Sequence, residues 1–68
     1  MWVWIVKPEN KIFDTKEEAV NYMVTVSQEF YNQKQHSGGG YSRMNSGCKV
    51  VVKRGGATYI WEVSPLEK

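Results

Sequence analysis

Two apolar runs on either side of a glycine pair dominate the pattern of hydrophobic and polar positions. The stretch 48–63 reads CKVVVKRGGATYIWEV, with Gly55-Gly56 at its centre. A two-residue Gly-Gly loop favours a β-hairpin, because a type I′ turn needs positive φ at both central residues. The sequence therefore predicts a hairpin over 48–63. Its four predicted cross-strand pairs are Arg54 with Ala57, Val52 with Tyr59, Val50 with Trp61, and Cys48 with Val63.

This pairing sorts the hairpin side chains onto two faces, since paired residues lie on the same side of a sheet. The first face is expected to be the core, because it collects an apolar set: Val50, Val52, Tyr59, Trp61 and Val63. The second face is polar at both ends and apolar only at its centre, where Val51 pairs with Ile60.

The opening stretch 2–6, WVWIV, is β-branched and aromatic, which favours a strand. Both of its sides are apolar, so we expect a central strand covered on both faces. Its neighbours would be the hairpin and a short strand at Ile12-Phe13, reached through a turn at 7–10 that contains Pro8. Alternation alone leaves open whether the Trp2–Trp4 side or the Val3–Ile5 side faces the core.

A helix is predicted to follow, beginning near Thr15. Thr15 and Glu18 have the spacing of a capping box, in which each satisfies a free amide of the first turn. The helix is expected to end at about residue 33 or 34. Apolar residues then recur with helical spacing along one stripe: Ala19, Tyr22, Met23, Val26 and Phe30.

Two segments show no such periodicity. Residues 35–47, QHSGGGYSRMNSG, are rich in glycine and serine and are interpreted as a flexible loop. Residues 64–68 are interpreted as a tail, because Pro65 has no N–H to donate to a strand ladder.

These elements predict a single α+β domain over 1–68, with one amphipathic helix packed on a small antiparallel sheet. The order is β-α-β-β, with a short extra strand before the helix left open. A chain of 68 residues buries only about 60% of the surface that its unfolded form exposes. Self-association or a partner would therefore add stability.

The composition offers little for catalysis. The net charge is +2, and the chain has one histidine, His36, and one cysteine, Cys48, which is expected on the core face. Neither has a partner suited to proton transfer, and the pair is too few for a metal site. We therefore expect no enzymatic activity, no cofactor and no metal.

Binding is better supported by the pattern. One helix covers one face of a sheet, so the opposite face keeps Val51 and Ile60 beside part of residues 2–5, which includes Trp2 and Trp4 if they point outward. An apolar patch with a polar rim is typical of interaction sites. The predicted rim cations are Lys49, Lys53 and Arg54. A second copy of the chain and a foreign protein remain equal candidates for the partner.

Nucleic-acid binding is the alternative. Tyr41 and Arg43 of the loop would lie beside the basic hairpin, where an aromatic ring stacks on a base and cations neutralise phosphates. The low net charge and the absence of a nucleic-acid motif place this hypothesis second.

The whole pattern resembles that of small standalone phage and mobile-element proteins. The features that carry the resemblance are the aromatic opening strand, the short turn, the stretch FDTKEEAVNYM at 13–23 and the closing hairpin. Some proteins of this group block host enzymes or defence proteins, so the resemblance implies a non-enzymatic inhibitor or adaptor. No apolar run approaches the roughly 20 residues of a membrane span. We therefore expect a protein of the host cytoplasm.

Overall fold

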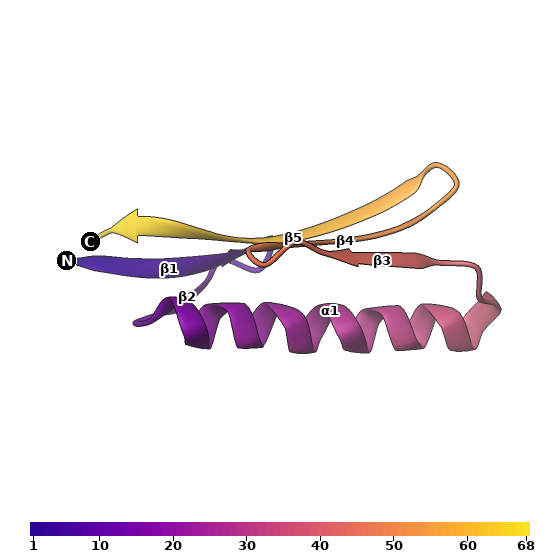
Figure 1. Cartoon of the computed structure of the whole chain (residues 1–68), viewed down its shortest axis with the longest axis horizontal. Helices are drawn as coiled ribbons and strands as arrows, with labels where there is room; N and C mark the ends of the chain where they lie inside the picture. The colour runs from indigo at the N-terminus through magenta and orange to yellow at the C-terminus, as the bar shows by residue number, and fades with distance from the viewer.

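A computed structural model describes residues 1–68, which form one helix packed on a five-stranded sheet (Figure 1). All strand pairs are antiparallel, in the order β2-β1-β5-β4-β3. The predicted α+β class is confirmed. The elements are β1 (Trp2–Lys7), β2 (Lys11–Phe13), α1 (Lys16–Gly38), β3 (Ser42–Asn45), β4 (Lys49–Arg54) and β5 (Ala57–Glu67).

The sheet is staggered, because β5 is long enough to serve two sets of neighbours. Its first half pairs with β4, and its second half pairs with β1. The molecule is therefore elongated, with extents of 43 × 19 × 18 Å. Both chain termini lie at one end, called the proximal end below (Figure 1). The β4–β5 turn and the C-terminal end of α1 lie at the other, the distal end.

The predicted hairpin is confirmed in its register, but only Gly55 of the glycine pair has a positive φ, so the turn is not type I′. Arg54 pairs with Ala57, and the predicted pairs of Val52 with Tyr59 and of Val50 with Trp61 lie farther toward the proximal end. Beyond them, the Val63 N–H donates to the Cys48 carbonyl at 2.8 Å. The expected central position of the first strand is also confirmed, since β1 lies between β2 and β5.

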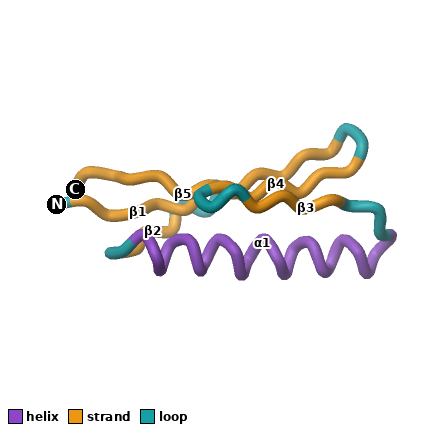
Figure 2. The backbone as a smooth tube through the Cα atoms, in the orientation of Figure 1, coloured by secondary structure: helices purple, strands orange, loops and turns teal.

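The helix begins as the capping box predicts. The Thr15 hydroxyl oxygen accepts a hydrogen bond from the Glu18 N–H at 3.2 Å, and the same hydroxyl donates to the Glu18 carboxylate at 2.9 Å. The helix ends at Gly38, however, beyond the predicted end at 33 or 34. Figure 2 shows the short loop that joins the end of α1 to β3. Contacts with residues outside the helix explain the extension: Arg54 donates to the Gly38 carbonyl, and the Tyr41 N–H donates to the Gln35 side-chain oxygen.

The prediction of one loop over 35–47 is wrong. Residues 35–38 are the last turn of α1, and 42–45 form β3 against β4. Within 35–47, only 39–41 and 46–47 lie outside the helix and strands. The sequence pattern does not predict β3, because this strand is a short edge strand of four residues with a single apolar side chain at Met44. A strand that pairs on one side and buries little surface needs no apolar alternation.

The prediction of a tail over 64–68 is also wrong. Residues 64–67 continue β5, and Pro65 pairs with Trp4 of β1. Pro65 is tolerated because of the stagger. The Val63 N–H points toward β4, and N–H groups alternate along a strand, so the nitrogen of Pro65 also points to that side. β4 has already begun at Lys49, opposite Glu62, and leaves no strand there for Pro65 to bond.

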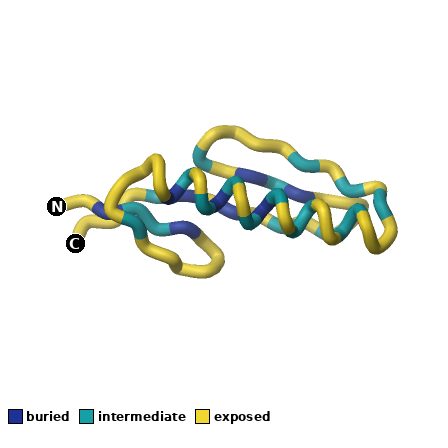
Figure 3. Tube along the Cα trace, turned by 90° about the horizontal axis from the view of Figure 1, so that it is seen from below, coloured by how far each residue is buried: buried dark blue, intermediate teal, exposed yellow.

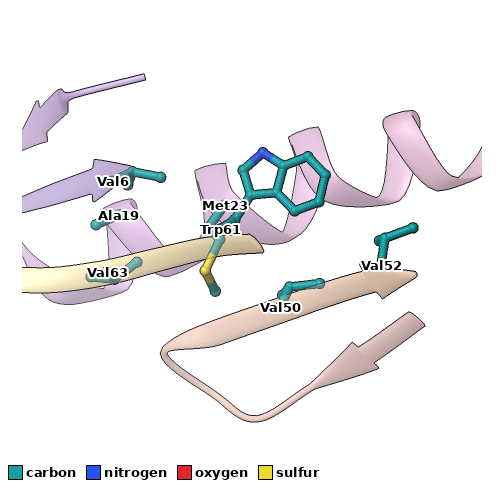
Figure 4. Close-up of a cluster of buried hydrophobic side chains, with 7 residues drawn as sticks. All are labelled: Val6, Ala19, Met23, Val50, Val52, Trp61 and Val63. Carbon is teal, nitrogen blue, oxygen red and sulfur yellow. The ribbon is translucent and has the colours of Figure 1, made fainter. Parts of the chain in front are cut away.

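The core lies between α1 and one face of the sheet (Figure 4). We call this the covered face. Figure 3 shows that most buried residues lie where the helix crosses the strands, while both ends of the molecule are exposed. The cluster consists of Val6, Ala19, Met23, Val50, Val52, Trp61 and Val63.

Candidate protein-binding face

The side of the sheet opposite the helix, called the open face below, carries an apolar row across three strands. Met44 of β3 pairs with Val51 of β4, which pairs in turn with Ile60 of β5. Met44 is 63% exposed and Ile60 is 44% exposed, while Val51 between them is half-buried. We call these three residues the distal apolar row. The exposed apolar centre predicted for the hairpin is thus present, and β3 widens it.

A second apolar group lies on the open face nearer the chain termini. Ile5 of β1 pairs with Ile12 of β2, and Val3 pairs with Leu66 of β5. Ile12 and Leu66 remain 47% and 40% exposed, whereas Val3 is only 4% exposed. We call Ile5, Ile12 and Leu66 the proximal apolar group, in which Ile5 is half-buried and the other two are exposed.

Charged residues separate the two apolar groups. Glu62 of β5 pairs with Lys49 of β4 on one side and with Lys7 of β1 on the other. This row alternates in sign across the sheet and is exposed. Along β5, the distal apolar row lies at Ile60 and the proximal apolar group lies level with Ser64. These two positions are four residues apart, or about 13 Å in an extended strand. A partner that covers both groups must therefore also face these charges.

The two tryptophans do not belong to the open face, which corrects their assignment as partner-binding residues. Val6 pairs with Val63, a core residue, and alternation puts Trp2 and Trp4 on the same side as Val6. Trp4 packs against the core cluster, and the Lys16 ammonium lies 5.7 Å from the centre of its ring. Trp2 is 57% exposed, but on the covered side near the chain termini.

The predicted rim cations are divided between the two faces. Lys49 and Lys53 pair with Glu62 and Thr58 and lie exposed on the open face. Arg54 lies on the covered side, because strand residues alternate. Its guanidinium carbon lies 5.6 Å from the centre of the Tyr41 ring, and its Nη1 donates to the Gly38 carbonyl at 3.4 Å.

Tyr41, Arg43 and Arg54 all lie on the covered side, where Tyr41 contacts Arg54 and Arg43 contacts the helix. Arg43 lies on β3, pairs with the buried Val52 and faces the helix. Its Nη2 donates to the Ser27 hydroxyl at 3.4 Å, and its buried Nε has no hydrogen-bond partner. Lys49 and Lys53 lie on the open face instead. The residues of the nucleic-acid hypothesis therefore do not form one surface: Tyr41, Arg43, Lys49, Lys53 and Arg54.

The chemistry-bearing side chains are dispersed. His36 is exposed near the end of α1, and Cys48 is half-buried against the core, on the face predicted for it. No group of three or more histidine, cysteine, aspartate or glutamate residues is placed to hold a metal ion. The Tyr22 hydroxyl donates to the Glu9 carboxylate at 2.8 Å, and this hydrogen bond raises the pKa of Tyr22. The helix does not combine the length and apolarity needed to cross a membrane.

Sequence reasoning missed three of the exposed apolar residues. Met44 fell in the predicted loop, Leu66 in the predicted tail, and Ile12 in a strand that was left open. The available signal was that Met44 and Leu66 are each an isolated large apolar residue in a polar segment. Such a residue is unexplained in a loop but fits a strand with one exposed side.

Comparison with known proteins finds no matching family model, no similar curated protein and no similar solved structure.

Proposed function

We propose that this chain is a small non-enzymatic protein-binding module, which docks on its partner through the open face. The observation that carries the proposal is the distal apolar row, where Met44 and Ile60 remain exposed on either side of Val51. Apolar side chains that line up across three strands form a continuous surface. Such a patch with a polar rim is typical of interaction sites.

The charged row supports the same proposal. Lys49, Glu62 and Lys7 lie beside the apolar residues, where they select the orientation of a partner and raise the association rate more than the affinity. The distal apolar row supplies the affinity, and the charged row determines the orientation of the partner. This division of labour matches a docking surface with an apolar centre and a polar border.

A binding module of this size acts by covering a surface of its partner. We therefore propose an inhibitor or adaptor, encoded by a phage or mobile element, that occludes a host protein. The similarity of the sequence pattern to small phage proteins supports this part of the proposal, and the open face supplies a surface for it.

The proposal is tested by affinity capture from lysate with three forms of the protein. The wild type is expected to retain a distinct set of proteins, and Ile60→Asp is expected to lose it, because a carboxylate at the centre of the interface must be desolvated. Thr25→Asp places the same charge on an exposed position of the helix and should behave as the wild type. Equal capture by all three forms would show that the open face does not bind the captured proteins.

Size-exclusion chromatography with light scattering distinguishes the two kinds of partner. A foreign partner predicts a monomer for the free protein and a heterocomplex after capture. A dimer that Ile60→Asp converts to a monomer would instead assign the open face to self-association.

A further inference from the structure

One edge of β5 is left without a neighbouring strand at the distal end. The β1–β5 ladder stops at the pair Lys7–Glu62, so nothing continues β1 alongside 57–61. The Val63 N–H points toward β4, and alternate residues point the same way. The N–H and C=O groups of Thr58 and Ile60 therefore point to the free edge. None of the backbone hydrogen bonds made outside the helix and strands involves these two residues.

The other free edge of β5, at the proximal end, is protected by its sequence. Pro65 lies on that edge and has no N–H to offer. The adjacent end of the chain is held by a hydrogen bond from the Lys68 N–H to the Met1 carbonyl at 2.9 Å. Natural proteins commonly protect edge strands with proline. The edge at Thr58 and Ile60 has no such protection, so the two edges of the same strand differ in their capacity to accept another strand.

Charge is segregated along the molecule in a way that bears on this edge. Segments 30–46 and 50–60, which form the distal end, contain no carboxylate and four cations: Lys34, Arg43, Lys53 and Arg54. The rest of the chain carries five lysines and seven carboxylates. The distal end is therefore positive and the remainder is negative, although the net charge of the whole chain is only +2.

Two of these cations lie near Thr58 and Tyr59, one on each face of the sheet. On the covered side, the Lys34 ammonium lies 5.6 Å from the centre of the Tyr59 ring and 5.3 Å from that of Phe30. On the open side, Lys53 is the cross-strand partner of Thr58 and therefore lies on β4, one strand away from the free edge. A strand added along 57–61 would have Lys34 on its covered side and an apolar contact at the exposed Ile60 on its open side.

We propose that β5 accepts an extended acidic segment of a partner protein as an additional strand along Ala57–Trp61. This inference rests on the proposed protein-binding function and specifies the partner's chemistry. Backbone groups of the segment bond to Thr58 and Ile60, and alternate side chains reach the two faces. An apolar residue beside Ile60 extends the distal apolar row on the open face, and carboxylates at the alternate positions lie on the covered side, near Lys34.

A protein strand fits this edge better than a nucleic acid does. Unpaired N–H and C=O groups alternating along an edge match another peptide backbone, whereas phosphates accept hydrogen bonds and donate none. The aromatic rings at this end are also engaged by the chain's own cations: Arg54 lies over Tyr41, and Lys34 lies over Tyr59. Rings covered in this way are less open for stacking on bases.

The test uses a blocked hexapeptide of alternating glutamate and valine as the probe. At millimolar concentration it is expected to shift the amide resonances of Thr58 and Ile60 and to slow their exchange with deuterium. Two peptide controls are expected to bind far more weakly: one with lysine in place of glutamate, and one N-methylated on the amides that face β5. Equal binding of the lysine peptide would refute the charge argument, and equal binding of the N-methylated peptide would refute strand addition.

A pair of substitutions tests the edge from the side of the protein. Thr58→Pro removes the edge N–H as Pro65 does naturally at the other edge, and we expect about fivefold weaker peptide binding from the loss of one hydrogen bond. Thr58→Val keeps the N–H and should bind as the wild type does. Should Thr58→Pro fail to fold, the comparison of methylated and unmethylated peptides on the wild type decides the question.

The outcomes separate this inference from the proposed function. If the peptide leaves Thr58 and Ile60 unprotected while Ile60→Asp abolishes capture from lysate, strand addition is wrong and the open-face function stands. If the peptide binds and capture is insensitive to Ile60→Asp, the edge carries binding and the face does not. Tighter binding of a short oligothymidylate than of the peptide, with steep salt dependence, would overturn the assignment to a protein partner.

Discussion

The two faces of this sheet are built from similar side chains and differ in what covers them. Val52 on the covered face is fully buried beneath α1, while its neighbour Val51 on the open face is half-buried. Val50 is also fully buried, whereas Ile60 on the open face is 44% exposed. Composition alone does not separate the two faces. The single helix separates them, because it buries the apolar residues of one face and leaves those of the other face partly exposed.

Two methionines provide the sharpest test of this difference. Met23 of α1 is fully buried in the core, and Met44 of β3 is 63% exposed. Met23→Ala is expected to lower the free energy of unfolding by about 2–5 kcal/mol through lost burial and a residual cavity. Met44→Ala should change it by less than about 0.5 kcal/mol, as exposed positions usually do. Urea denaturation measures both, and equal losses would mean that the open face is part of the core.

The contrast between the faces also depends on where the helix begins. Thr15→Ala removes the acceptor for the Glu18 N–H and should cost about 1 kcal/mol of stability in the same denaturation measurement. Thr25→Ala, at an exposed position inside the helix, provides the matched control and should raise stability by about 0.5 kcal/mol, because alanine has the higher helix propensity. If the two variants have the same stability, the cap does not contribute to holding the helix on the sheet.

The smallest expected effect concerns Tyr22, which joins the helix to the turn between β1 and β2. Its hydrogen bond to Glu9 raises its pKa above 10.0, so the neutral phenol is favoured in the folded state. The stabilisation is complete below the unfolded pKa and is lost as pH rises through the folded pKa. We expect stability to fall above pH 10, with a smaller fall in Tyr22→Phe. Denaturation midpoints of the two proteins across this pH range measure the difference.

The sequence predicts an element correctly where residues close together in the chain determine it and no distant contact overrides them. Gly55-Gly56 determines the hairpin and its register, and Thr15 with Glu18 determines the start of the helix. Both depend on residues close together in the chain. The hairpin register in turn predicts correctly that Val51 and Ile60 share a face without the helix.

The features that the sequence does not reveal are determined by distant contacts. The last turn of α1 is held by Arg54, and β3 exists because β4 offers it an edge. Pro65 lies within a strand only because the sheet is staggered. The side of Trp4 follows from pairing with β5, which alternation within residues 2–6 does not specify. For these reasons Met44 and Leu66 join the candidate site only when the whole sheet is known.

The most direct test of the central claim is the thermal unfolding of Ile60→Asp, followed by far-UV circular dichroism. If the open face is a docking surface, the variant keeps the helical signal of the wild type and a cooperative transition, because residue 60 is already 44% exposed. It should then also lose its partner. A variant that is unfolded at room temperature, or that melts as early as Met23→Ala, would show that Ile60 belongs to the core and would contradict the account.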